Sequence, residues 1–265
     1  MATLPPQPRK RLGQHFLIDP NLLRKIVNFA DITAEDSVCE IGPGGGALTW
    51  WLCQKAKQVL ALEVDSRMVD FLKTELAEHA NLEIREQDAL RYSFNDLPES
   101  TIVVANLPYN ISTPILFQML EAKSKIRRMV LTVQLEVAQR LAAKPSTKAY
   151  GVLSVMAQHL AEVQFGFRIP KQCFRPIPDV DSGVVRLEIR QPIQETQEEQ
   201  IQFQRVVRAA FSQRRKTLMN SLRSSGLSEE SLQQVQQDSD ISLARRAETL
   251  SVEEFRYLSM ALPSL

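Results

Sequence analysis

Apolar residues along the first 190 positions alternate between a spacing typical of helices and one typical of buried strands. Residues 21–29 have helical spacing and follow Asp19 and Pro20, which are typical helix-start residues. Short β-branched runs then alternate with further helical stretches, as in an open α/β sheet. We predict strands at residues 37–41, 58–64, 82–86, 102–105, 128–134, 161–169 and 183–190. Further helices are predicted at residues 47–56, 66–79, 113–121, 135–143 and 153–159.

The pattern changes after Arg190, where Gln, Glu and Ser dominate with helical periodicity and no strand signal. The Pro-rich stretch 173–182 lies between the last two predicted strands and is therefore predicted to be a loop. We predict two domains: residues 1–190 form the α/β domain with a Rossmann-like sheet, and residues 191–265 form a small C-terminal all-helical domain.

Composition indicates an ordinary globular chain of 265 residues, 44% of them hydrophobic. It contains no apolar run of about 18 residues, and its start lacks the apolar stretch of a secretory signal, so we expect a cytoplasmic protein without a membrane segment. Cysteines at positions 39, 53 and 173 form no Cys-x-x-Cys pair, and the three histidines are far apart. We therefore expect neither disulfides nor a metal site.

Basic residues are clustered, although the formal net charge is only +1. The stretch 201–226 contains no acid, which is typical of a surface that binds a polyanion. The clusters are Arg9, Lys10 and Arg11; Lys123, Lys125, Arg127 and Arg128; and Arg205, Arg208, Arg214, Arg215, Lys216 and Arg223. We predict that Arg208, Arg214, Arg215, Lys216 and Arg223 bind RNA.

The predicted strand 102–105 ends in Asn106-Leu107-Pro108-Tyr109. The carboxyl end of such a strand is where an open α/β sheet carries its site. The Asn106 side-chain oxygen and the carbonyl of Leu107 or Pro108 can accept hydrogens from a base amino group while Tyr109 stacks on the ring. Methylation of a base amine is therefore one interpretation, and a simple strand stop followed by a turn is the other.

Acids and glycines at three other predicted strand ends are arranged as for an adenosine ligand. Gly42 and Gly44 open a loop before a helix, Glu63 follows Gly42 at roughly the 20-residue spacing of a ribose-binding acid, and Asp88 follows the third strand. Glu40, before the loop, suits the ammonium of a methionine moiety but would repel a pyrophosphate. We therefore favour S-adenosylmethionine over NAD, although the loop by itself also fits a loose dinucleotide pattern.

Several segments together resemble the ribosomal RNA adenine dimethyltransferase family, close to its bacterial small-subunit branch, over nearly the whole chain. They are residues 10–17 (Lys-Arg-Leu-Gly-Gln-His-Phe-Leu), 40–49 (Glu-Ile-Gly-Pro-Gly-Gly-Gly-Ala-Leu-Thr), 61–65, 87–90, 106–109 and 174–182. The resemblance implies an S-adenosylmethionine-dependent methyltransferase. Its expected product is the N6,N6-dimethyl form of two adjacent adenosines in a hairpin loop near the 3′ end of 16S rRNA in the small ribosomal subunit.

The resemblance also implies that residues 1–20 cover the cofactor, with His15 and Leu17 contacting it beside Gly42, Glu63, Asp88 and Asn106. It implies further that Phe174 sandwiches the base together with Tyr109. The family commonly has Asn at position 15 and often Lys at position 179. We expect His15 to keep the pocket with some pH sensitivity, and Asp179 to weaken local attraction for RNA.

Two alternatives share these motifs. One is a large-subunit rRNA adenine methyltransferase of the antibiotic-resistance type, and the other is a non-catalytic ribosome-assembly or transcription factor on the same fold. The full-length match and the loop 174–182 favour the small-subunit enzyme, and intact Glu63, Asp88, Asn106 and Tyr109 favour retained catalysis. We expect a monomer.

Overall fold

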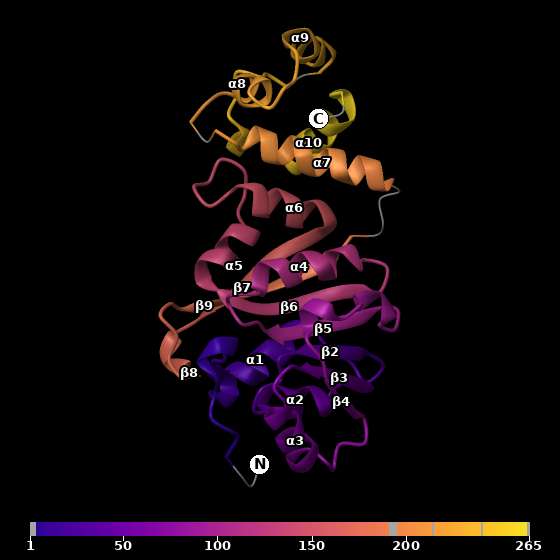
Figure 1. The fold of residues 1–265 in the computed structure, drawn as a ribbon, viewed down its shortest axis with the longest axis vertical. Helices are drawn as coiled ribbons and strands as arrows, with labels where there is room; N and C mark the ends of the chain where they lie inside the picture. The colour runs from indigo at the N-terminus through magenta and orange to yellow at the C-terminus, as the bar shows by residue number, and fades with distance from the viewer. Residues whose placement is uncertain (1–3, 191–194, 214, 240, 264–265) are drawn as a thin grey trace. The chain divides into compact units, whose positions relative to one another are not determined.

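The computed structural model describes residues 4–190, 195–213, 215–239 and 241–263, which form two compact units (Figure 1). The first unit is Met1–Gln139 with Ala161–Arg190, and the second is Arg140–Leu160 with Gln191–Leu265. One division between the units falls after Arg190, and Arg140–Leu160 belongs to the second unit and not to the sheet domain. Periodicity reveals that a segment is helical but not which neighbour covers its apolar face, so this assignment could not be read from the pattern of residues.

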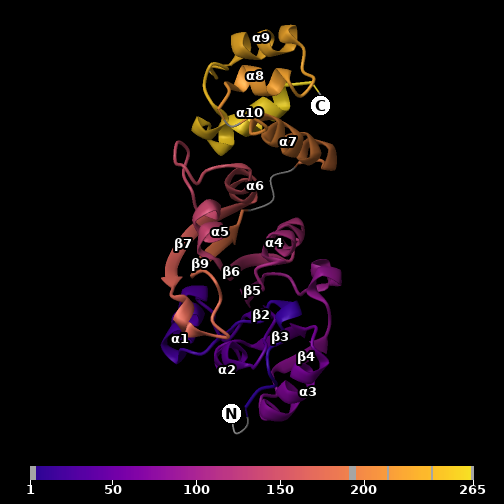
Figure 2. The same ribbon diagram turned by 60° about the vertical axis from the view of Figure 1, so that its left-hand side comes forward.

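The first unit contains a seven-stranded sheet in the order β4-β3-β2-β5-β6-β9-β7. Strands β4 to β6 run parallel, while β9 pairs antiparallel with both β6 and β7. Figure 2 shows β4 and α3 at one edge of this sheet and β7 at the other. The sheet strands are β2 (Ser37–Ile41), β3 (Gln58–Glu63), β4 (Leu82–Glu86), β5 (Thr101–Asn106), β6 (Ile126–Gln134), β7 (Ala161–Ile169) and β9 (Ser182–Ile189).

The predicted α/β order of the first unit is confirmed. Asp19 caps α1 by accepting from the backbone N–H groups of Asn21 and Leu22, and Pro20 occupies the first turn. The short strands β1 (Phe16–Leu17) and β8 (Phe174–Arg175) pair antiparallel outside the main sheet. The helices of this unit are α1 (Pro20–Ala30), α2 (Ala47–Cys53), α3 (Ser66–Glu75) and α4 (Ser112–Glu121). Helix α5 (Leu135–Leu141) begins in this unit. The 3-10 helices are η1 (Lys10–Leu12), η2 (Ala89–Arg91), η3 (Phe94–Asp96) and η4 (Lys171–Cys173).

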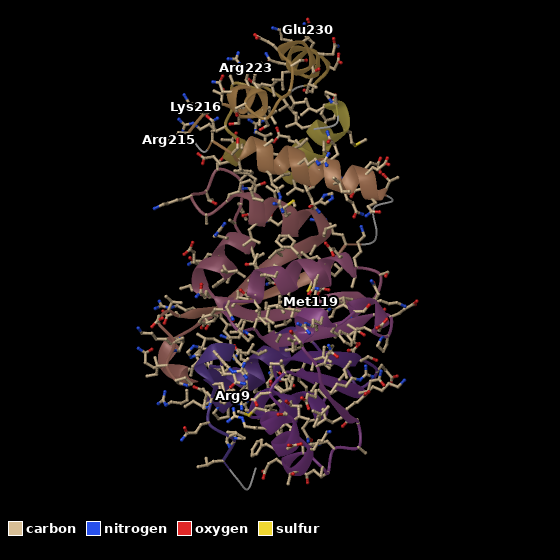
Figure 3. The ribbon with its side chains drawn as sticks, viewed as in Figure 1. Arg9, Met119, Arg215, Lys216, Arg223 and Glu230 are labelled. Carbon is tan, nitrogen blue, oxygen red and sulfur yellow. The ribbon has the colours of Figure 1, made fainter. Side chains whose placement is uncertain are left out.

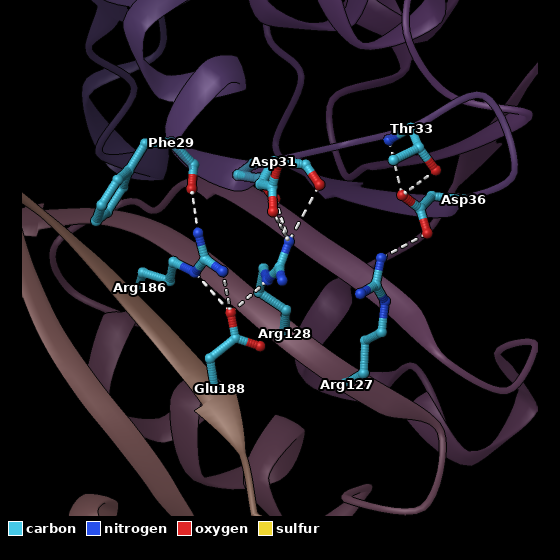
Figure 4. Close-up of polar contacts among 9 residues, drawn as sticks. Phe29, Asp31, Thr33, Asp36, Arg127, Arg128, Arg186 and Glu188 are labelled. Atoms are coloured by element: carbon cyan, nitrogen blue, oxygen red, sulfur yellow. Dashed lines mark hydrogen bonds and ion pairs between the residues drawn. The ribbon is translucent and has the colours of Figure 1, made fainter.

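Two arginines of one basic cluster, Arg127 and Arg128, pair with acidic residues of the first unit (Figure 4). Arg128 is buried, lies 2.5 Å from Glu188, and donates to the carbonyl of Ala30 at 2.8 Å. Arg127 lies 2.5 Å from Asp36. These arginines join β6 to β9 and to the end of α1, so their charge is used within the fold.

The second unit is helical within its described residues. Capping boxes start two of its helices: Thr196 with Glu199 before α7, and Ser251 with Glu254 before α10. Its elements are α6 (Val152–Leu160), α7 (Gln197–Ala210), α8 (Leu218–Arg223), α9 (Glu229–Asp238), η5 (Ala247–Thr249) and α10 (Val252–Ala261). None of the helices in the described parts of either unit has the length and apolar character needed to cross a membrane.

Candidate active site

A cavity lies at the carboxyl ends of four adjacent strands of the first unit. Because β4, β3, β2 and β5 are neighbours and parallel, the residues that end them meet at one edge of the sheet. The cavity holds about 680 Å³ of space, part of it open to solvent. Most of the predicted site residues line it: His15, Gly42, Gly44, Glu63, Asp88, Asn106, Leu107, Pro108 and Tyr109.

The glycine loop has a left-handed backbone at the cavity wall. Gly42 has a φ of 68°, and a Cβ added there would meet no atom within 4 Å. Gly44 has a φ of 53°, and a Cβ there would lie 2.5 Å from the Phe16 ring. Gly42 therefore leaves room beside the cavity, while Gly44 allows the N-terminal segment to pack onto the loop.

Glu63 is nearly fully buried, and backbone groups hold its carboxylate. Oε1 accepts from the N–H groups of Val64 and Asp65, each at 2.9 Å, and Oε2 accepts from Gly44 at 3.1 Å. Burial raises the pKa of Glu63, and these three hydrogen bonds oppose the shift. The carboxylate thus joins the end of β3 to the glycine loop at the cavity wall.

Asp88 follows β4 and Asn106 ends β5. Because β4 and β5 are the outer two of the four strands at the cavity, these two residues lie at its opposite ends. Asp88 Oδ1 accepts from the Leu90 N–H at 3.0 Å, which caps η2 and fixes the carboxylate. Gln87 also lines the cavity, although the sequence analysis did not single it out. Its position directly after the end of β4 is the signal that would have identified it.

Asn106 ends β5, and its amide is oriented by the N-terminal segment. Nδ2 donates to the carbonyl of His15 at 2.9 Å, so Oδ1 is the acceptor left for a ligand. Of the two carbonyls considered next to it, that of Pro108 accepts from the Ile111 N–H at 3.1 Å. In the described parts of the chain no backbone donor is bonded to the Leu107 carbonyl, which makes it the better second acceptor.

Tyr109 is half-buried, and both its hydroxyl and its ring have partners. The hydroxyl lies 2.8 Å from Ser182 Oγ, and burial raises the pKa of the phenol. The His15 ring lies 5.8 Å from the Tyr109 ring between centroids, with 21° between the planes, and His15 Nδ1 lies 2.8 Å from the Pro176 carbonyl. His15 thus connects the N-terminal segment to Tyr109 and to the loop 174–182.

Leu17 and Glu40, which are also predicted to contact the cofactor, do not line this cavity. Both line a neighbouring, mainly apolar cavity that shares Gly42 and Asn106 with the first. Leu17 belongs to the hydrophobic core. The Glu40 carboxyl is 1% exposed, and its Oε2 has no hydrogen-bond partner among the described residues.

Phe174, which is predicted to stack on the base, lies in the core of this structure. Its ring has no exposed surface, belongs to the same core cluster as Leu17, and lies opposite Leu17 in the β1–β8 pair. Stacking of this ring on a base stays a prediction, and it requires the ring to become exposed. The sequence motif did not reveal this burial, because the β1–β8 pairing that encloses the ring joins segments far apart in the chain.

A family model described as ribosomal RNA adenine dimethylase matches residues 6–260. The chain belongs to this family. Proteins named ribosomal RNA small subunit methyltransferase A from Geobacillus sp. (strain WCH70) and Bacillus cytotoxicus are each 45% identical to it, over 96% of this chain and 91% of theirs. Members of the family are methyltransferases that act on rRNA and need a methyl donor, so this chain is an rRNA adenine methyltransferase.

Solved structures of family relatives have the same architecture. A dimethyladenosine transferase from Plasmodium falciparum matches with a TM-score of 0.75 and 26% identity, over 92% of this chain and 95% of that one. The 23S rRNA methyltransferase ErmE matches with a TM-score of 0.74 and 27% identity, over 93% and 99%. The predicted Rossmann-like methyltransferase fold is thereby confirmed.

The predicted RNA-binding residues of this family member lie on the helical unit (Figure 3). Arg208 is exposed near the end of α7, and Arg215 and Lys216 are exposed in the turn that follows. Arg223 is exposed too, but it lies 3.7 Å from Glu229. Arg214 lies outside the described residues.

Burial of Glu40 predicts a specific dependence of stability on pH. Desolvation raises the pKa of Glu40 from 4.5 to about 8, and the neighbouring charge of Glu63 adds to the shift. The unfolded chain releases this proton above about pH 4.5 and the folded protein only near pH 8, so the free energy of unfolding falls as pH rises across this window. Glu40→Gln should remove this part of the fall, roughly 2 to 4 kcal/mol between pH 5 and 8.5. Urea unfolding at several pH values measures it, with Glu86→Gln on the exposed end of β4 as control; equal pH dependence in Glu40→Gln and the unmodified protein would contradict the assignment.

The position of Phe174 predicts that Phe174→Leu affects folding more than chemistry. Leucine still fills most of the space, so we expect a loss of about 1 to 2 kcal/mol in the free energy of unfolding and a nearly unchanged kcat for the folded enzyme. Urea unfolding and a methyl-transfer assay on the same preparation separate the two effects. A kcat that falls tenfold or more at unchanged stability would instead support stacking of Phe174 on the base.

Proposed function

We propose that this protein transfers methyl groups from S-adenosylmethionine to N6 of two adjacent adenosines in the small-subunit 16S rRNA. The observation that carries the proposal is the position of Asn106 and Tyr109 at one end of a cavity whose other end is lined by Glu63 and Asp88. Residues that can hold the adenine amine and residues that can bind an adenosine-containing methyl donor thus line the same cavity. The 45% identity with relatives named as small-subunit methyltransferases supports this choice of subunit.

The residues of the cavity fit S-adenosylmethionine. Gly42 leaves open space beside the cavity, as a ligand in close contact with the backbone requires. Glu63 and Asp88 are acceptors of the kind that bind a ribose diol and an adenine amine. Burial raises the pKa of Glu40, so an ion pair between Glu40 and the ligand's ammonium has to offset the cost of burying the charged carboxylate.

The bound cofactor supplies a methyl group already activated by its sulfonium centre. Asn106 Oδ1 and the Leu107 carbonyl accept the two hydrogens of the adenine amine and direct its lone pair away from the ring plane. Tyr109 supplies a ring face for the base, held in place by the Ser182 hydroxyl and the His15 ring. Positioning of this kind accounts for rate without a dedicated general base, since the methylated ammonium releases its proton to water.

The decisive experiment uses labelled S-adenosylmethionine and small subunits from a strain that lacks the modification, followed by mass spectrometry of the nucleosides. We expect N6,N6-dimethyladenosine in 16S rRNA. Large subunits are assayed in parallel, because ErmE is a 23S rRNA methyltransferase with a similar fold. Label that appears only in 23S rRNA would replace the proposal with the large-subunit activity, and no label in either RNA would favour a non-catalytic role.

A further inference from the structure

The loop between α5 and α6, residues 142–150, is anchored to the C-terminal part of the second unit. The Ser146 N–H donates to the Glu248 carbonyl at 2.7 Å, and the Tyr150 hydroxyl donates to the Leu250 carbonyl at 2.9 Å. Tyr150 is 2% exposed, and its ring contacts Phe211 edge-on with 6.3 Å between centroids. The loop therefore has a fixed place on the helical unit.

The segment that anchors this loop also pairs with the start of α8. The Leu218 N–H donates to the Arg245 carbonyl at 2.7 Å, and the Met219 N–H donates to the Leu243 carbonyl at 2.9 Å. The segment 243–248 is thus bonded both to the loop at Ser146 and to the start of α8, although the three segments are far apart in the sequence.

Each of these three segments carries exposed positive charge. Four exposed residues form no ion pair within the described residues: Lys144, Arg246, Arg215 and Lys216. Arg245 differs, because its guanidinium is paired with Glu254. Figure 3 shows Arg215 and Lys216 projecting from the same edge of the helical unit. Unpaired cations held on a fixed backbone are available to an anionic partner.

The other exposed side chains of the loop support a phosphate-bearing partner. Ser146 carries an exposed hydroxyl, while the Thr147 hydroxyl donates to the Lys144 carbonyl at 2.7 Å. Hydroxyls together with Lys and Arg supply most phosphate contacts in nucleic-acid complexes. The large exposed apolar residues of this unit, Ile201, Tyr257 and Met260, lie outside the three segments. A surface of this composition suits an RNA backbone better than an apolar protein interface.

We propose that the loop 142–150, through Lys144, forms part of the RNA-binding surface together with Arg215 and Lys216. The inference rests on the proposed function, since the RNA is that of the methylated subunit. It adds a contact from a segment that precedes the strands β7 and β9 in the chain. Lys144 contacts phosphates and therefore contributes affinity that depends on salt but not on base sequence.

The test compares Lys144→Ala with Lys57→Ala, a control at an exposed lysine before β3 in the first unit, and with Arg215→Ala as a reference. Dissociation constants for unmethylated small subunits are measured with the full-length protein at several salt concentrations. We expect Lys144→Ala to lower the slope of log Kd against log salt by about one, as Arg215→Ala should, and Lys57→Ala to leave it unchanged.

A slope for Lys144→Ala equal to that of the unmodified protein would overturn the inference. The proposed function would survive that result as long as the unmodified protein still forms dimethyladenosine in 16S rRNA. Failure of the unmodified protein to methylate any rRNA would instead overturn the proposed function. Thermal unfolding of each variant confirms that the loop substitution leaves the fold intact, and Lys144→Gln repeats the test if Lys144→Ala unfolds.

Discussion

Asn106→Ala should lower the kcat for methyl transfer by about 10²- to 10³-fold, while the Kd for S-adenosylmethionine changes less than fivefold. The loss follows from the missing Oδ1 acceptor, because an amine that is not held in a near-attack position reacts far more slowly. Glu63 and Asp88, which we assign to the cofactor, are untouched by the substitution. Single-turnover transfer to small subunits measures the chemical step, and equilibrium binding of labelled cofactor measures the affinity.

Asn110→Ala is the matched control, since Asn110 is an exposed asparagine four residues further along the same loop. A second variant, Asn106→Asp, retains an oxygen but loses the donor to the His15 carbonyl. If Asn106→Ala weakened cofactor binding tenfold or more while single-turnover transfer stayed at the unmodified rate, Asn106 would act by holding the N-terminal segment and not by orienting the amine.

Glu63→Ala should lower the free energy of unfolding by roughly 5 kcal/mol and reduce cofactor affinity beyond detection. The substitution leaves three backbone N–H groups without their acceptor, those of Gly44, Val64 and Asp65. Hydrogen bonds to a charged acceptor contribute about 1.5 to 3 kcal/mol each, and water entering the space recovers part of the loss. The loop at Gly44 also loses its connection to β3, so the cavity wall should lose its shape.

Glu86→Ala provides the control for Glu63→Ala. Glu86 is paired with Glu63 in the β3–β4 register, but its side chain is exposed. We expect a change within about 0.5 kcal/mol for this variant. Urea unfolding measures both variants, and titration with labelled cofactor measures the affinity. Equal stability of the two variants would show that the buried hydrogen bonds of Glu63 contribute little.

Burial decided which of the predicted site residues lie at the cavity. Strand ends could be predicted because a buried parallel strand is a short apolar run, and polar residues directly after it must lie at the carboxyl edge. That rule placed Glu63, Asp88 and Asn106 correctly. Glu40 is not at the end of its strand, because Ile41 ends β2, and its side chain lines the neighbouring cavity.

The sequence by itself determined the α/β order, the strand ends that form the site and the family, because each is encoded in local periodicity or in contiguous motifs. Tertiary structure alone decided the rest. The β1–β8 pair buried Phe174, and ion pairs with Glu188 and Asp36 used the charges of Arg128 and Arg127. Backbone hydrogen bonds linked both the loop of Lys144 and the start of α8 to the segment 243–248. All of these depend on contacts between distant segments, and the same residue types can equally be exposed or buried until those segments meet.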